Sequence, residues 1–143
     1  MTKELDEKLC AKYPLIFAGR NKSMTETAMC WGFECGDGWY WLINRLCSNL
    51  QWNTDHNNTS GKYPQVVAVQ VKEKFGGLRF YIESASDAQY AVIDFAETLS
   101  EYTCEKCGSV KDVGQTTIRW VTTLCKECAE REKFEDWKQY KET

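Results

Sequence analysis

Apolar residues recur at helical spacing in three stretches, residues 2–13, 38–50 and 86–101, which we predict to be helices. Pro14 would end the first of them. The stripes expected to be buried are Leu5, Leu9 and Tyr13 in the first stretch, Trp39, Leu42, Ile43, Leu46, Cys47 and Leu50 in the second, and Val92, Phe95, Ala96 and Leu99 in the third. Helices with one apolar stripe need another apolar layer to pack against.

Polar residues mark where two of these helices begin. Ser86 and Gln89 have the spacing of a capping box, and Asp37 is predicted as the N-cap of the second helix. The polar stretch 51–64 predicts a loop, and His56 within it is the single histidine of the chain. Histidine-based catalysis would therefore depend on a loop residue.

Residues 65–83 alternate between apolar and polar types, which predicts a β-hairpin that turns at Gly76-Gly77. The apolar face, expected to pack on the helices, contains Val69, Val71, Phe75, Leu78, Phe80 and Ile82. The opposite face contains Gln70, Lys72, Lys74, Arg79, Tyr81 and Glu83. Glu73 falls on the apolar face, where an unpaired carboxylate is costly, so we expect it to have a partner. The candidate partners are Arg45, Lys74, Arg79 and a backbone amide near Gly36 or Gly38.

Two Cys-x-x-Cys pairs, Cys104/Cys107 and Cys125/Cys128, are separated by seventeen residues. Each turn can direct two thiolates at one ion, and two turns complete a tetrahedron, so the spacing predicts a four-cysteine Zn²⁺ site. The alternatives are a disulfide pair or a redox dithiol. No apolar signal segment opens the chain, which predicts a reducing cytoplasm, and redox motifs usually occur singly. A closed four-thiolate site leaves no open position for catalysis.

The cysteine turns define a second region. Residues 116–123 are rich in β-branched types and predict a strand of a zinc ribbon, and a charged helix is predicted from Cys128 to about Tyr140, anchored by Phe134 and Trp137. The predicted fold class is α+β. It consists of a β-hairpin or small antiparallel sheet packed with helices, followed by a four-cysteine zinc-ribbon module.

Composition fits this organisation. The chain has 143 residues, of which 43% are hydrophobic, and we predict an α+β domain over residues 1–101 and the zinc-ribbon module over 102–143. Apolar runs as long as about 18 residues are absent from the sequence, so no membrane partner is expected. The net charge of −3 argues against strong non-specific binding to nucleic acid.

The segment from Trp31 to Trp39 is dense in glycine and tryptophan. Glycines allow close approach of the backbone, and the N-terminus of the following helix favours anions. Trp31, Asp37 and Trp39 could therefore hold a planar or phosphate-bearing ligand. The alternative is a tight turn in which Asp37 caps the helix and both tryptophans belong to the core.

Lys72, Lys74, Arg79 and Tyr81 form a second candidate surface. Cations beside an aromatic ring suit a small anionic ligand, an acidic protein or nucleic acid. In the predicted register Lys74 lies opposite Arg79, which favours a partner anion. An ordinary solvated strand face would carry the same residue types.

Three further hypotheses concern reactive side chains. Asp37 and Glu73 would form an acid/base pair if the fold brought them together. Cys35 precedes a helix N-terminus, which would lower the pKa of its thiol and make it reactive. Cys10, Cys30, Cys35 and Cys47 would form a second metal site if they clustered, although free buried cysteines usually pack as small hydrophobes.

Residues 34–39 (ECGDGW), residues 70–81 (QVKEKFGGLRFY) and the paired Cys-x-x-Cys turns together resemble a group of small phage and prophage proteins. The resemblance covers about residues 13–130. It implies an origin and a place in the cytoplasm of a bacterial host cell, and not a particular activity. Phage accessory proteins of this size often bind and disable a host factor, such as a defence system.

Three functions are compatible with these patterns. The first is a non-catalytic, zinc-containing phage accessory protein that binds a host protein or a small anionic ligand. The second is a nucleic-acid-binding zinc-ribbon protein, which the basic strand face favours and the net charge opposes. The third is an enzyme that acts through Asp37, Glu73 or Cys35. We favour the first, because the charge is acidic, the zinc site is closed and histidine is scarce.

Overall fold

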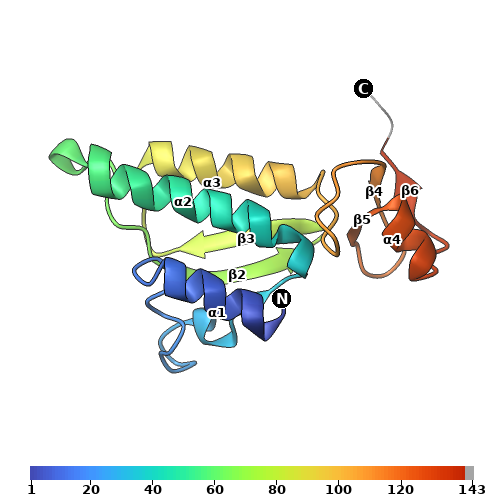
Figure 1. Cartoon of the computed structure of the whole chain (residues 1–143), viewed down its shortest axis with the longest axis horizontal. Helices are drawn as coiled ribbons and strands as arrows, with labels where there is room; N and C mark the ends of the chain where they lie inside the picture. Colours follow the sequence, from blue (N-terminus) through green and yellow to red (C-terminus); the bar gives the residue numbers. More distant parts are fainter. Residues whose placement is uncertain (141–143) are drawn as a thin grey trace.

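The computed structural model describes residues 1–140, which form an α+β fold with a larger and a smaller part (Figure 1). The larger part contains α1 (Lys3–Lys12), β1 (Phe33–Glu34), α2 (Tyr40–Asn57), β2 (Ala68–Lys74), β3 (Gly77–Ile82) and α3 (Asp87–Ser100), with short 3-10 turns at Ala28–Trp31, Asp37–Trp39 and Thr59–Gly61. The smaller part contains β4 (Val113–Gln115), β5 (Thr123–Cys125), α4 (Lys126–Arg131) and β6 (Lys138–Gln139). This arrangement confirms the predicted fold class.

Each of the two parts has its own cluster of buried apolar side chains. The first lies between the helices and the sheet and includes the fully buried Trp39 and Ile43. The second surrounds the C-terminal cysteines and centres on Leu124. The domain boundary predicted at residue 101 falls between the last residue of the first cluster and the first residue of the second. Among the described helices, none has the length and apolar content that a membrane span requires.

The larger sheet has the strand order β1-β2-β3, with β1 parallel and β3 antiparallel to β2. The predicted hairpin is present, but Lys74 pairs with Gly77, so the turn residues are Phe75 and Gly76 instead of two glycines. Their φ angles of 54° and 80° are the positive values that this kind of tight turn requires. Phe75 therefore stands 75% exposed at the hairpin tip, and the prediction that it is buried is wrong.

Leu78, Phe80 and Val71 lie in the core as predicted. Val69 does not, because the register of β2 shifts between Ala68 and Gln70. This β-bulge gives the buried position to Ala68 and leaves Val69 on the outer face of the sheet. The apolar pattern alone could not reveal the shift, since valine suits either face of a strand.

Helix α3 covers the free edge of β3. The Leu78 amide donates to Ser100 Oγ (2.7 Å), and the Phe80 amide donates to Glu97 Oε1 (2.7 Å). An open strand edge is a site for unwanted pairing with other chains, and these two acceptors close it. Burial raises the pKa of the Glu97 carboxyl, while the Phe80 amide partly offsets that rise.

The need to present Ser100 and Glu97 to the edge of β3 sets the rotation of α3 about its axis. The capping box of Ser86 and Gln89 is confirmed. The buried residues, however, are Gln89, Ile93, Ala96 and Ser100. Phe95 and Leu99 are 63% and 40% exposed, so the prediction that they are buried is wrong. The polar acceptors must face the strand edge, and this requirement turns the apolar pair outward.

Helix α2 buries most of its predicted stripe, although Leu42 is only partly buried, and the helix continues well beyond it. Its last residue is Asn57, so the loop predicted over residues 51–64 is wrong for its first half. Trp52 and His56 stack on the exposed end of the helix with their ring centroids 4.9 Å apart. Asp37 is not the N-cap of this helix, because it lies within the preceding 3-10 turn and its Oδ1 accepts from the Thr2 amide (2.6 Å).

The smaller sheet has the order β5-β4-β6. Residues 116–122 form the loop between β4 and β5, so the strand predicted over residues 116–123 retains only its last residue. The helix predicted from Cys128 to Tyr140 is instead α4, which ends at Arg131 before the chain returns as β6. Trp137 packs on the second core and donates to the Leu124 carbonyl oxygen (2.9 Å).

We expect Phe80→Ala to lower the free energy of unfolding by about 3–5 kcal/mol, because the missing ring leaves a cavity in the core. Phe95→Ala is the matched control, since the Phe95 ring is largely exposed and its loss should cost less than about 1 kcal/mol. Urea denaturation of both variants measures the difference. Equal costs would contradict the faces described for β3 and α3.

Candidate metal centre and ligand-binding face

The four C-terminal cysteines converge on one point, as their spacing predicted. The Sγ atoms of Cys104, Cys107, Cys125 and Cys128 all lie within 4.8 Å of one another. The second pair stands where β5 passes into α4, and the first pair forms a turn after α3. Three of the four side chains are buried, and Cys107 is exposed.

The distances between the sulfurs fit a tetrahedral ion. Cys107 Sγ and Cys125 Sγ are 3.7 Å apart. A tetrahedron with metal–sulfur bonds of ~2.3 Å has edges of about 3.8 Å. A disulfide would need an S–S distance of about 2.05 Å, and all eight cysteines are free thiols. The donor set could therefore hold a metal ion that prefers thiolate ligands.

Burial and hydrogen bonding act in opposite directions on the charge of these sulfurs, and burial raises the pKa of the Cys107 and Cys128 thiols. Burial opposes ionisation of Cys104, but backbone hydrogen bonds from Cys125, Cys107 and Lys106 leave the pKa of its thiol lowered. Arg131 Nη2 donates to the Sγ atom of Cys128 at 3.2 Å. Contacts of this kind orient metal ligands and stabilise their charge.

The first cysteine turn packs directly on the loop that precedes α2. The Gly38 amide donates to the Glu105 carbonyl oxygen (2.8 Å), and the Gly36 amide donates to Glu105 Oε1 (2.8 Å). A Cβ at Gly38 would collide with the Cys104 carbonyl oxygen, and a Cβ at Gly36 would collide with that of Glu105. These two glycines therefore serve close packing against the metal-binding turn.

The same packing determines whether the first candidate surface, formed by Trp31, Asp37 and Trp39, can bind a ligand. Trp39 is fully buried, and its indole N–H donates to the Thr103 carbonyl oxygen (2.9 Å). Trp31 is 63% exposed. Because Trp39 belongs to the core, it offers no face to a ligand, and the two rings cannot enclose one. Asp37 is engaged by the Thr2 amide.

Glu73 has the partners that its position demands, although they are not the predicted ones. Its Oε1 accepts from the Gly76 amide (2.7 Å), and its Oε2 accepts from the Trp120 indole N–H (3.0 Å). Asp37 and Glu73 are thus held by different donors in different places. No hydrogen bond within residues 1–140 joins the two carboxylates as an acid/base pair.

The remaining cysteines are isolated thiols. Within the described part of the chain, the C-terminal four are the one group of cysteines close enough to share an ion. Burial raises the pKa of Cys35 to about 12 and that of Cys10 to about 12, and it also raises the pKa of the fully buried Cys47. Cys35 is therefore a protonated, buried thiol at neutral pH, contrary to the prediction that it is activated. Cys30 is half-buried.

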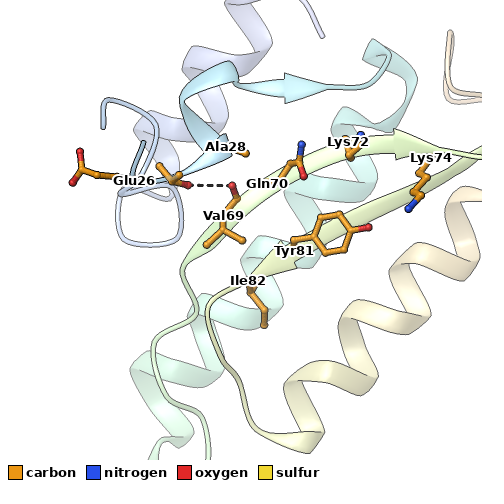
Figure 2. A pocket seen from close by; sticks show the side chains of 9 residues that line it. Glu26, Ala28, Val69, Gln70, Lys72, Lys74, Tyr81 and Ile82 are labelled. Atoms are coloured by element: carbon orange, nitrogen blue, oxygen red, sulfur yellow. Dashed lines mark hydrogen bonds between the residues drawn. The ribbon is translucent and has the colours of Figure 1, made fainter. Parts of the chain in front are cut away.

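The second candidate surface is intact on the outer face of β2 and β3. Lys72, Lys74 and Tyr81 border an open cavity of about 620 Å³, together with Gln70 from β2 and Glu26 from the segment before β1 (Figure 2). These side chains stand on the side of the sheet away from α2 (Figure 2).

Arg79 lies on the neighbouring strand. It is directly opposite Lys72 in the register, rather than opposite Lys74 as predicted, and its Nη1 donates to the Leu78 carbonyl oxygen (2.7 Å). Within residues 1–140, none of Lys72, Lys74 and Arg79 forms an ion pair.

Three residues near this face had no part in the sequence-based predictions of a site. Phe75, Arg119 and Trp120 line a neighbouring cavity of about 410 Å³ that also includes Lys72 and Lys74. The aromatic residues were assigned to the core or to a strand because apolar and β-branched neighbours surround them. The one available signal was the arginine-tryptophan pair inside an otherwise uncharged run.

Comparisons with models of protein families, with curated proteins and with solved structures find no match to this chain.

We expect Cys104→Ser to remove the hydrogen-exchange protection of the Gly36 and Gly38 amides as well as that of residues 104–128. The reason is that both glycine amides donate to Glu105, which lies inside the metal-binding turn. Exchange measured by mass spectrometry would show it, with peptides from the first half of α3 as the internal control. Unchanged protection at Gly36 and Gly38 would contradict the dependence of this loop on the cysteine turn.

Proposed function

We propose that this protein is a non-catalytic, zinc-containing protein that binds an anionic partner on the outer face of β2 and β3. The observation that carries the proposal is the gathering of Lys72, Lys74 and Arg79 beside Tyr81, with no ion pair to any of the three among residues 1–140. Glu26 is the one carboxylate that lines the cavity. Cations left unpaired on one face raise the local concentration of anions.

Zn²⁺ is the ion that we assign to the cysteine cluster. Four thiolates in a tetrahedral array suit Zn²⁺ or iron, and a closed Zn²⁺ site of this kind contributes folding energy. The ion would be held by Cys104, Cys107, Cys125 and Cys128, and its effect would be to fix the two turns that carry them.

We expect freshly purified protein to contain one zinc per chain. Chelation should unfold the smaller part, because the energy of binding the ion is part of its folding energy. Metal analysis by mass spectrometry measures the stoichiometry, and Cys104→Ser is the comparison that should lose the metal. Iron in place of zinc, or a chain without metal, would contradict the assignment.

The environments of the candidate catalytic residues support a binding role over catalysis. Cys35 is a buried thiol whose pKa is raised to about 12, and Asp37 and Glu73 are separately hydrogen-bonded. The single histidine, His56, stacks on Trp52 at the exposed end of α2. Each residue named for an enzymatic function is thus explained by packing or by a local hydrogen bond.

We place the partner in the cytoplasm of a bacterial host. This part of the proposal rests on the resemblance of residues 34–39, residues 70–81 and the paired cysteine turns to phage and prophage proteins. A small protein without catalytic groups would act on its host by occupying a host factor, such as a component of a defence system. An anionic surface on that factor would match the basic face of β2 and β3.

We expect Lys72→Glu/Lys74→Glu to weaken capture of the partner from bacterial extract by at least about tenfold, which is ~1.4 kcal/mol of binding free energy. Lys62→Glu/Lys111→Glu is the matched control, because it changes the net charge by the same amount at exposed positions outside the cavity. Bound material is eluted with salt and quantified as protein and as nucleic acid. Equal capture by both double variants would contradict the proposed face.

A further inference from the structure

Two hairpin tips meet beside the basic face. The turn Phe75-Gly76 of β2 and β3 touches the smaller sheet, where the Thr123 hydroxyl donates to the Gly76 carbonyl oxygen. The loop between β4 and β5 reaches back, and its Trp120 donates to Glu73 at 3.0 Å. A Cβ at Gly76 would collide with the Gln115 side chain, so the contact is close. The two tips are therefore held in one fixed arrangement.

Both tips expose large side chains on a strained backbone. Phe75 and Trp120 are exposed to solvent over most of their surface, 71% in the case of Trp120. Phe75 has a φ of 54° and Arg119 a φ of 64°, in a region that favours glycine, asparagine or aspartate. The Phe75 and Trp120 side chains are not part of either hydrophobic core. Bulky residues that strain the backbone and leave the core indicate a function outside folding.

The aromatic rings are held ready for a ligand. Glu73 accepts a hydrogen bond from the indole N–H group of Trp120, and the residue is still 71% exposed. The Nζ atom of Lys74 lies 5.6 Å from the centroid of the Phe75 ring. A ring that is already fixed loses less conformational freedom when a ligand stacks on it.

Cations and rings alternate along a continuous track. Lys72 and Lys74 line both the cavity that contains Tyr81 and the cavity that contains Trp120. Tyr81 pairs with Gln70, and the turn residue Phe75 lies five residues further along the chain, just after β2, a span of about 16 Å at ~3.3 Å per extended residue. Stacked nucleotides rise ~3.4 Å each along a strand, so the track suits about five of them.

We propose that the ligand of this face is a single-stranded nucleic acid whose bases stack on Phe75 and Trp120 while Lys72, Lys74 and Arg119 contact its phosphates. The inference rests on the proposed function, since it names the chemistry of the anionic partner. An acidic protein would use the lysines but would not require exposed rings beside them. A duplex hides the faces of its bases from such rings, whereas a single strand offers them at every nucleotide.

The test measures the affinity for three labelled ligands by fluorescence anisotropy. Two are single strands of about ten nucleotides, a thymidine DNA and a uridine RNA, and the third is a duplex of equal length. We expect Phe75→Ala and Trp120→Ala each to weaken binding about 5- to 150-fold. Phe95→Ala and Trp52→Ala are the matched controls, because these rings are exposed on α3 and α2, and they should leave binding unchanged. Trp120→Phe should lose less affinity than Trp120→Ala, since it keeps a stacking ring but not the N–H group that Glu73 accepts from. Circular dichroism and zinc content confirm that each variant is folded.

The outcomes separate this inference from the proposed function. Single strands bound equally by wild type, Phe75→Ala and Trp120→Ala would overturn the stacking proposal. The stacking proposal would also be overturned if single strands did not bind and an acidic protein were captured instead. Dependence of that capture on Lys72 and Lys74 would still support the basic face as a binding surface. Duplex bound as tightly as single strand would also overturn the stacking proposal. If Lys72→Glu/Lys74→Glu weakened the binding of no ligand, the proposed function would be overturned as well.

Discussion

The packing of the Cys104–Cys107 turn on Gly36 and Gly38 is the contact on which the arrangement of the two parts depends. Here two backbone segments, far apart in the sequence, lie in close contact, and the Glu105 side chain takes part in it. Glu105 serves both glycine amides, one with its carbonyl oxygen and one with its carboxylate. A sliding motion would break both of these hydrogen bonds at once, which makes it costly.

The cysteine cluster and the basic face are connected through few residues. Cys125 is the last residue of β5 and Thr123 is the first, and Thr123 holds the hairpin tip at Gly76. An ion that fixes Cys125 would therefore also fix the position of the hairpin tip. Glu73 and Trp120 close a second contact between the same two parts. A metal site far from any reaction can in this way determine the shape of a binding surface.

Sequence alone was sufficient where a single local rule decides the structure. Cysteine spacing predicted the cluster, the Ser86–Gln89 pair predicted the start of α3, and the apolar stripe of α2 predicted its buried side. It failed where tertiary contacts compete with the pattern. Helix α3 turned Phe95 outward because Ser100 and Glu97 are needed at the edge of β3.

Two other features had too little local signal to be predicted. Strand β1 has only two residues, so no periodicity can reveal it, and it is defined by its parallel pairing with β2. The turn at Phe75 contradicts the preference of such turns for glycine, and the expected Gly76-Gly77 turn was the better local choice. At Phe75 the local rule and the structure disagree, and its side chain lies beside the candidate binding face, where function can override folding preference.

The net charge of the chain is a poor guide to this face because the charges are unevenly placed. Asp87, Asp94, Glu97 and Glu101 all belong to α3 or its end, along the edge of the sheet, and not to its outer surface. Exposed charges separated by more than about 8 Å are largely screened at physiological ionic strength, so the carboxylates that matter at Lys72 and Lys74 are nearby ones, such as Glu34, which pairs with Lys72 in the register of β1 and β2. Arg79 differs from these lysines, because its charge lowers the otherwise raised pKa of Glu97 and is thus partly used inside the protein. Lys72 and Lys74 line both cavities and are therefore the cations of this sheet most available to a ligand.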